Sequence, residues 1–325
     1  MAKPVQRPST PEIAAVIPCY RESERILDVV AAIGSEVDLI IVVDDACPEH
    51  SGDTVRDGSD DPRVVVLKHE TNQGVGGATL TGYAHAVEAG CTIIVKIDGD
   101  GQMDPALVPS LVAPIRAGRA DYVKGNRFYD LESISGMPKI RIFGNLALSF
   151  ASKMSSGYWH VFDPTNGFTA IHAKVAAKLP RAKISKSYFF ESDMLFRLNI
   201  MRAVVEDMPM QAHYGAEQSS LKIGNILSEF SRKHLVNAWK RVFYTYFLRD
   251  FSVASIELVL GKLFFLFGVV FGGYQWWRSA ETGVPATAGT VILAALPIIL
   301  GSQFLIAFLD HDTRNAPRHP IHPHM

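Results

Sequence analysis

Residues 1–125 alternate short apolar runs with stretches of helical spacing. The apolar runs are rich in β-branched residues, which is typical of parallel strands buried on both faces. They are Ile13–Pro18, Leu39–Val43, Val64–Leu67, Ile93–Ile97 and Tyr122–Lys124. The helical stretches between them are Glu24–Ile33, Ala78–Ala89 and Pro105–Ala117. This βαβ order predicts an α/β domain with a mainly parallel sheet, the architecture of many nucleotide-binding proteins.

Two long apolar stretches follow residue 250. Val253–Trp277 has Glu257 and Lys262 as its charged residues, and Ala288–Leu309 has none. Each is about as long as the ~20 residues that cross a bilayer as a helix. The short connector Arg278–Thr287 therefore predicts a transmembrane helical hairpin. The alternative is a pair of buried core helices, but the sequence contains no other segment that could cover them.

Basic residues on either side of the first apolar stretch indicate its orientation. They crowd the N-terminal side, whereas the connector carries Arg278 as its only basic residue. The crowded residues are Lys222, Arg232, Lys233, Lys240, Arg241 and Arg249. By the positive-inside rule, the N-terminal domain and the residues after the hairpin face the cytoplasm. We therefore expect a protein of the cell membrane with a cytoplasmic main domain.

The segments that flank the hairpin have their own patterns. Ile223–Arg249 alternates basic with apolar or aromatic residues at helical spacing. This suits a helix on the membrane surface and equally an amphipathic helix packed on the domain, and both can hold. The tail contains His311, His319, His322 and His324, which could bind a metal, but its prolines and irregular spacing favour disorder. The expected organisation is a cytoplasmic domain (1–222), membrane-surface helices (223–250), two transmembrane helices (251–310) and a disordered cytoplasmic tail (311–325).

Composition excludes several classes of protein. A net charge of -1 over 325 residues argues against nucleic acid as a partner, because nucleic-acid-binding proteins normally carry a strong basic excess. Three cysteines without metal-like spacing, Cys19, Cys47 and Cys91, favour a reducing cytosol over a disulfide framework. The polar segment Met1–Pro11 lacks the apolar core of a signal peptide.

Acidic residues follow two of the predicted strands. Asp44 and Asp45 follow the second strand, and Asp98 and Asp100 follow the fourth, with Gln102 just beyond. Because α/β sheets bind ligands at the carboxyl ends of their strands, these side chains are candidates for a binding site. Two carboxylates one residue apart on a glycine-rich turn can converge on Mg²⁺ or Mn²⁺, which would stabilise a departing diphosphate. A solvated acidic turn is the alternative interpretation.

A glycine-rich turn, Asn72–Ala78, lies between a predicted strand and a predicted helix. It approaches the dinucleotide-binding fingerprint, but Thr79 stands where the third glycine would be. The turn therefore supplies either a helix N-terminus that favours phosphate or simply a tight connection.

Six motifs in this order and spacing resemble a known family. They are Ile17–Glu22, Val43–Asp45, Asn72–Ala78, Asp98–Gln102, Gly125–Arg127 and Asp163–Phe168. The chain resembles the inverting family-two glycosyltransferases of GT-A fold, and among them the polyprenyl-phosphate hexosyltransferases that include dolichol-phosphate mannose synthase. The resemblance implies a Rossmann-like GT-A domain followed by the two-helix hairpin. It also implies transfer of one hexose from a UDP- or GDP-sugar to a polyprenyl phosphate held in the membrane.

The resemblance assigns roles to individual residues. It implies a nucleoside pocket lined by Pro18, Tyr20, Glu22, Val43 and Asp45. It implies that Asp98, Gly99 and Asp100 bind the nucleotide-sugar and that Asp100 and Gln102 hold the metal. Arg127 and Arg141 would bind phosphates of the donor and the acceptor, as suits the guanidinium group, and Gly125–Phe150 would contain a loop that orders over the acceptor.

The position of the family's general base departs from the usual pattern, because the chain reads Phe190–Asp193 there. Asp193 is the candidate catalytic carboxylate, but a phosphate acceptor is already anionic near pH 7 and needs no base. Asp163, Glu191 or Asp193 would then position the sugar or an arginine, or form structural ion pairs.

Three other functions remain as alternatives. The first is transfer to a hydroxyl of a lipid-linked glycan, which would require a base. The glycine turn suggests the second, a membrane-tethered oxidoreductase, and the third is a nucleotide-sugar sensor or scaffold protein without catalysis. A single hairpin cannot enclose a polysaccharide channel, whereas a homo-oligomer could.

Overall fold

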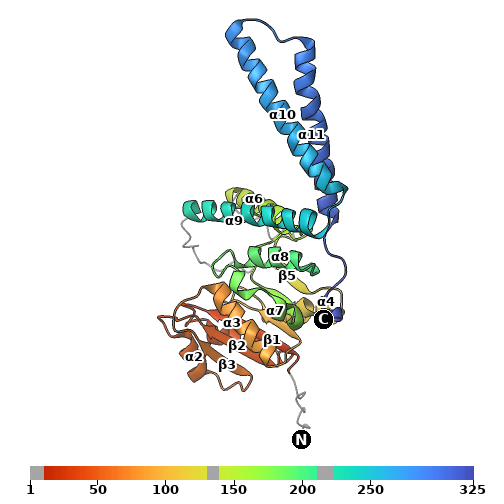
Figure 1. Ribbon diagram of the computed structural model, residues 1–325. Helices are drawn as coiled ribbons and strands as arrows, with labels where there is room; N and C mark the ends of the chain where they lie inside the picture. Colours follow the sequence, from red (N-terminus) through yellow and green to blue (C-terminus); the bar gives the residue numbers. More distant parts are fainter. Residues whose placement is uncertain (1–10, 130–138, 211–222) are drawn as a thin grey trace. The chain divides into compact units, whose positions relative to one another are not determined.

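The computed structural model describes residues 11–129, 139–210 and 223–325. The chain forms two compact units. The first comprises Met1–Ala238 together with Pro317–Met325, and the second comprises Trp239–Ala316. Figure 1 shows the course of the chain through both.

The first unit contains a seven-stranded sheet in the order β3-β2-β1-β4-β6-β5-β7. β6 runs antiparallel to β4 and β5, and the other neighbours are parallel. The strands are β1 (Ile13–Cys19), β2 (Leu39–Asp44), β3 (Val64–Lys68), β4 (Ile93–Lys96), β5 (Tyr122–Asn126), β6 (Thr169–His172) and β7 (Val205–Pro209). The predicted α/β class and the five predicted strands are confirmed, and β6 and β7 are additions.

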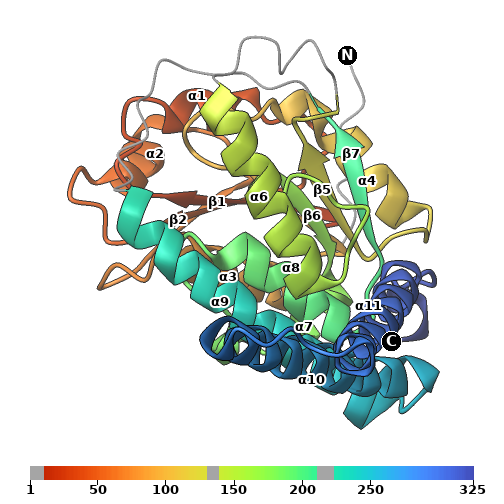
Figure 2. The ribbon, with the colours of Figure 1, turned by 90° about the horizontal axis from the view of Figure 1, so that it is seen from above.

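Helices cover both faces of this sheet (Figure 2). α1, α2 and α4 pack on one face, and α3, α7 and α8 pack on the other. Alternate residues of β1 enter the two cores, as expected for a strand buried on both faces. The helices are α1 (Ile26–Ala32), α2 (Ser51–Gly58), α3 (Val75–Glu88), α4 (Val108–Arg116), α6 (Lys139–Ser156), α7 (Ala173–Lys178), α8 (Phe190–Ile200) and α9 (Ile223–Phe243).

The C-terminal segment packs into the first unit instead of forming the disordered tail that we expected. The backbone N–H groups of Ile321 and His322 donate to the carboxylate of Asp121. The ring of His322 lies 2.7 Å from the same carboxylate through Nδ1 and stacks on His172 with centroids 4.2 Å apart. The prediction fails because the carboxylate that accepts these hydrogen bonds belongs to Asp121, about 200 residues earlier in the chain. The sequence of the tail alone does not reveal this partner.

The second unit is a helical hairpin. α10 (Val253–Thr282) and α11 (Ala288–Arg314) are both long and apolar enough to cross a membrane. They pack closely at Gly268 and Gly301, where a Cβ would meet backbone atoms of the opposite helix. Small residues allow this kind of approach between helices in membranes. At the base of the hairpin, Arg241 forms a buried bidentate ion pair with Asp312, at 2.6 and 2.9 Å.

Candidate active site

A cavity of about 490 Å³ opens at the carboxyl ends of β1, β2 and β4. This is the end of an α/β sheet at which ligands normally bind. Its wall consists of Pro18, Cys19, Tyr20, Glu22, Asp45, Asn72, Gly74, Val75, Ala78, Asp98, Gly99, Asp100, Ser187 and Tyr188. The structure thus brings together most of the residues predicted for the donor. Val43 is buried in the core instead of lining the cavity.

Asp45 is fixed by the glycine-rich turn. Its two carboxylate oxygens accept the backbone N–H groups of Gln73 and Gly74, at 2.8 and 2.7 Å. Nδ1 of His69 lies 2.7 Å from the same carboxylate, and Nε2 of His69 lies 2.9 Å from Thr81 on α3. Gly74 has a φ of 81°, which favours glycine. These bonds join the end of β2 to the start of α3, and Asp45 and Gly74 form part of the cavity wall.

Asp98 forms an ion pair with a buried lysine. Nζ of Lys96, on β4, lies 2.6 Å from Oδ1 of Asp98 and 3.3 Å from Oε1 of Glu191 on α8. Burial alone would lower the pKa of Lys96, but the two carboxylates outweigh it and raise that pKa above its ordinary value. Lys96 is therefore a cation beneath the acidic wall of the cavity.

Asp100 and Gln102 lie on the turn that follows β4. The N–H of Gln102 donates to Oδ1 of Asp100 at 3.0 Å, and Gly101 between them has a φ of 74°. Asp100 lines the cavity, whereas Gln102 does not. Within residues 11–129, 139–210 and 223–325, no cluster of three or more histidine, cysteine, aspartate and glutamate side chains could hold a metal by itself.

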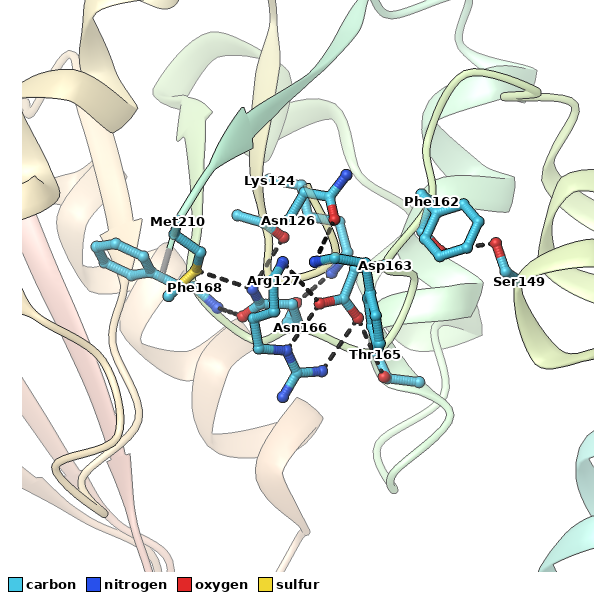
Figure 3. A network of polar contacts seen from close by, with 12 residues as sticks. Lys124, Asn126, Arg127, Ser149, Phe162, Asp163, Thr165, Asn166, Phe168 and Met210 are labelled. Atoms are coloured by element: carbon cyan, nitrogen blue, oxygen red, sulfur yellow. Dashed lines mark hydrogen bonds and ion pairs between the residues drawn. The ribbon is translucent and has the colours of Figure 1, made fainter. Parts of the chain in front are cut away.

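Arg127 and Asp163 form a bidentate ion pair outside this cavity (Figure 3). Nε and Nη2 of Arg127 donate to the carboxylate at 2.7 and 3.0 Å. The Asp163 side chain is 1% exposed and that of Arg127 is 28% exposed, so the carboxylate holds the guanidinium from the protein side. Asn166 braces the same turn, because its Nδ2 donates to the carbonyl of Gly125 at 2.8 Å and its own carbonyl accepts from Lys124.

Comparison with known proteins identifies the family of this chain. Residues 14–179 match Glycosyl transferase family 2. The chain belongs to this family. The UDP-N-acetylglucosamine–dolichyl-phosphate N-acetylglucosaminyltransferase of Methanococcus voltae is 29% identical over 232 residues, 67% of this chain and 92% of that protein. The undecaprenyl-phosphate mannosyltransferase of Micrococcus luteus is 30% identical over 202 residues, 61% of this chain and 82% of that protein.

Solved structures confirm the GT-A fold of this glycosyltransferase. The glucosyl-3-phosphoglycerate synthase of Mycobacterium tuberculosis, solved with Mn²⁺, uridine diphosphate and phosphoglyceric acid, superposes with a TM-score of 0.53. The match is 20% identical and covers 71% of this chain and 78% of that one. The family and fold predicted from the motifs are therefore correct.

Asp193 of the glycosyltransferase does not line the cavity. Its carboxylate accepts the N–H of Ser185 and Nδ2 of Asn237, both at 2.9 Å, and Nε of Arg197 lies 3.7 Å away. These bonds tie α8 to the preceding segment and to α9. Arg141 belongs to α6, but its side chain lies outside the described residues, as do residues 130–138 of the expected acceptor loop.

Sequence reasoning missed three residues of this site. Ser187 and Tyr188 line the cavity from the segment before α8, which has no recognisable pattern. Lys96 is the third. It is a single charged residue in an otherwise apolar strand, and this pattern could have indicated a buried ion pair.

Proposed function

We propose that this glycosyltransferase moves one hexose from a UDP- or GDP-sugar to a polyprenyl phosphate, with inversion at the anomeric carbon. The observation that carries the proposal is the combination, in one chain, of the acidic cavity on a family-2 sheet with two helices able to cross a membrane. The two relatives named above act on dolichyl and undecaprenyl phosphate, which supports the same class of acceptor.

In this proposal the cavity holds the donor. Pro18, Tyr20, Glu22 and Asp45 surround the nucleoside, and Val43 supports it from the core. The sugar and its diphosphate lie toward Asp98, Gly99 and Asp100 at the end of β4.

Asp100 and Gln102 would hold a divalent cation, Mg²⁺ or Mn²⁺. A carboxylate and an amide oxygen on one turn are the hard ligands that both ions prefer, and the donor diphosphate would complete the shell. The few protein ligands are consistent with an ion that keeps most of its shell for water and substrate. When bound, such an ion neutralises charge on the leaving diphosphate.

The acceptor phosphate would attack the anomeric carbon without a general base. A phosphate monoester is anionic near pH 7, because its second pKa is ~6. Arg127, oriented by Asp163, and Arg141 would offset its repulsion from the diphosphate. Asp193 is occupied by two N–H donors, which supports a positioning role for it over that of a base.

The hairpin would anchor the enzyme where the acceptor's phosphate emerges from the bilayer, with the catalytic domain in the cytoplasm. α9 supports a membrane-surface position, because Leu235 and Trp239 are 72% and 66% exposed while His234 and Asn237 are buried. A cysteine introduced at Thr282, the last residue of α10, should react with an impermeant reagent from the non-cytoplasmic side. Labelling from the cytoplasmic side would overturn this orientation.

The experiment that tests the function uses the purified full chain in lipid nanodiscs. It is incubated with Mn²⁺, a panel of UDP- and GDP-sugars, and either undecaprenyl phosphate or the dephosphorylated alcohol. We expect a hexosyl glycolipid, detected by mass, from the phosphate alone. Glycosylation of the alcohol would contradict the mechanism without a base, and the absence of product with every donor would contradict the function.

A further inference from the structure

Two buried lysines stand in one row across the middle of the sheet. Lys96 on β4 and Lys124 on β5 are both in register with Thr169 on β6, the strand between them. Both lysines are buried. A charged side chain rarely lies in a core unless it is paired, so each should have a reason to be there.

The partners of the two lysines differ. Lys124 donates to a backbone carbonyl, that of Asn166, whereas Lys96 contacts two carboxylates, those of Asp98 and Glu191. Burial lowers the pKa of Lys124 to about 8, and the more distant Asp163, Glu191 and Asp207 oppose this only in part. Of the two lysines, Lys96 is thus the one that contacts carboxylates directly, and one of these carboxylates, Asp98, lines the cavity.

The contact between Lys96 and Asp98 fixes the Asp98 carboxylate from below. The lysine is 1% exposed and the aspartate is 29% exposed, so Lys96 approaches from the core while Asp98 meets the cavity. The carbonyl of Gly167 lies 3.4 Å from Nζ of Lys96, and a Cβ on Gly167 would collide with both Lys96 and Asp98. Asp98 is therefore enclosed on the protein side by a cation and by the backbone of a tight turn.

We propose that Lys96 is a positioning residue for donor binding, acting through Asp98. The inference rests on the proposed function, because it takes the cavity to be the donor site. The lysine holds the carboxylate in one orientation toward the nucleotide-sugar. Its charge also offsets that of Asp98, which would otherwise repel the donor diphosphate. If Lys96 were only structural, it would serve to balance the charges of Glu191 and Asp98. Replacing Glu191 in the Lys96 variant would then restore both stability and donor affinity, whereas a positioning role predicts that stability alone returns.

The test replaces the charge and keeps the volume. Lys96→Met should weaken binding of UDP-glucose or GDP-mannose in the presence of Mn²⁺, whichever the wild type binds, by about tenfold to a hundredfold, because it removes a charged hydrogen bond. Titration calorimetry on the full chain measures the Kd. The donor KM should rise in parallel, and the acceptor KM should change little.

Three further variants separate positioning from folding. Lys124→Met, the matched control in the same row, should lower the melting temperature but leave the donor Kd within a few-fold of wild type. Glu191→Gln alone should bind the donor nearly normally, because Lys96 still holds Asp98. The double variant Lys96→Met with Glu191→Gln also removes the charge of Glu191, which Lys96→Met leaves without its lysine. It should therefore be more stable than Lys96→Met and still bind the donor weakly.

Two results would overturn the inference. One is a wild-type donor Kd in Lys96→Met, or in the double variant if the single variant does not fold. The other is a double variant in which affinity returns together with stability. If the wild-type chain binds neither of these two donors, the other UDP- and GDP-sugars of the panel replace them. A wild-type chain that binds none of the panel would contradict the proposed function, and the inference with it.

Discussion

Asp100 and Asp193 are acidic residues with different surroundings, and this separates their expected roles. Asp100 lines the cavity on a turn after β4. Asp193 is buried on α8, and its carboxylate accepts from Ser185 and Asn237. A residue that faces ligand should affect binding when it is changed, whereas one that satisfies buried donors should affect folding.

Replacement of Asp100 tests the metal. Asp100→Ala should weaken donor binding by about tenfold or more when Mn²⁺ is present, since a carboxylate ligand is lost. Without Mn²⁺ the variant and the wild type should bind the donor alike. Calorimetric titrations with Mn²⁺ and with excess chelator measure both. Full transfer activity of the wild type in excess chelator would exclude the metal's role.

Replacement of Asp193 tests the base. Asp193→Asn turns an amide NH₂ toward one of two N–H donors, so it should destabilise the domain by roughly 1–3 kcal/mol. Transfer by the folded fraction should stay within a few-fold of wild type. Thermal unfolding and initial rates on the same preparation give the comparison. An unchanged melting temperature with kcat reduced a thousandfold would identify Asp193 as the base after all.

At the scale of elements, α9 is attached to the catalytic domain by a histidine. Nδ1 of His234 lies 2.8 Å from Oγ of Ser155 on α6, and its ring meets Phe189 edge-on at 4.8 Å. Burial lowers the pKa of His234 to about 4. The histidine is therefore neutral in the folded protein near pH 7, and its protonation weakens this packing.

The stability of this attachment should depend on pH. The unfolded histidine takes up a proton at about pH 6.5 and the folded one at about pH 4. Stability is therefore full above pH ~6.5 and decreases as the pH falls toward 4. His234→Gln should flatten the slope, leaving the part due to His172, whose pKa is lowered to about 4 by burial and by His322. Melting temperatures measured between about pH 7.5 and 4.5 test this, and identical slopes for both proteins would contradict it.

The elements differ in how far the sequence predicts them. β1, β2 and β4 are apolar and β-branched, so their pattern carried the prediction. β6 has four residues, Thr169–His172, and pairs with strands distant in the chain, so no local signal marks it. The acidic strand ends at Asp45 and Asp98 were predicted from their position alone. Lys96 was not, because a buried ion pair depends on the tertiary neighbour Glu191.

At the scale of the whole molecule, the most distant contact described joins Asp121 to His322, 201 residues further along the chain. No periodicity in the sequence reports a contact of this kind. The prolines and histidines after α11 predict disorder, because their local pattern is irregular, yet the backbone and ring of His322 satisfy a buried carboxylate.

Removal of that ring should destabilise the catalytic domain. His322→Ala loses the contact with Asp121 and the stacking on His172, and should lower the melting temperature by on the order of 5 °C. His324→Ala is the matched control, since His324 is exposed. Thermal unfolding of the full chain compares the two. Equal melting temperatures would show that the ring of His322 contributes nothing to the stability of the domain.

The docked tail also makes the hairpin an insertion within the catalytic domain, since residues 317–325 follow both apolar helices and return to the unit that precedes them. During synthesis, Asp121 is made long before its partners Ile321 and His322. The domain therefore obtains its last hydrogen bonds only after the ribosome has produced both helices. The enzyme's fold is therefore completed only after the hairpin has been made, and a chain stopped before α10 would retain a buried carboxylate without those donors.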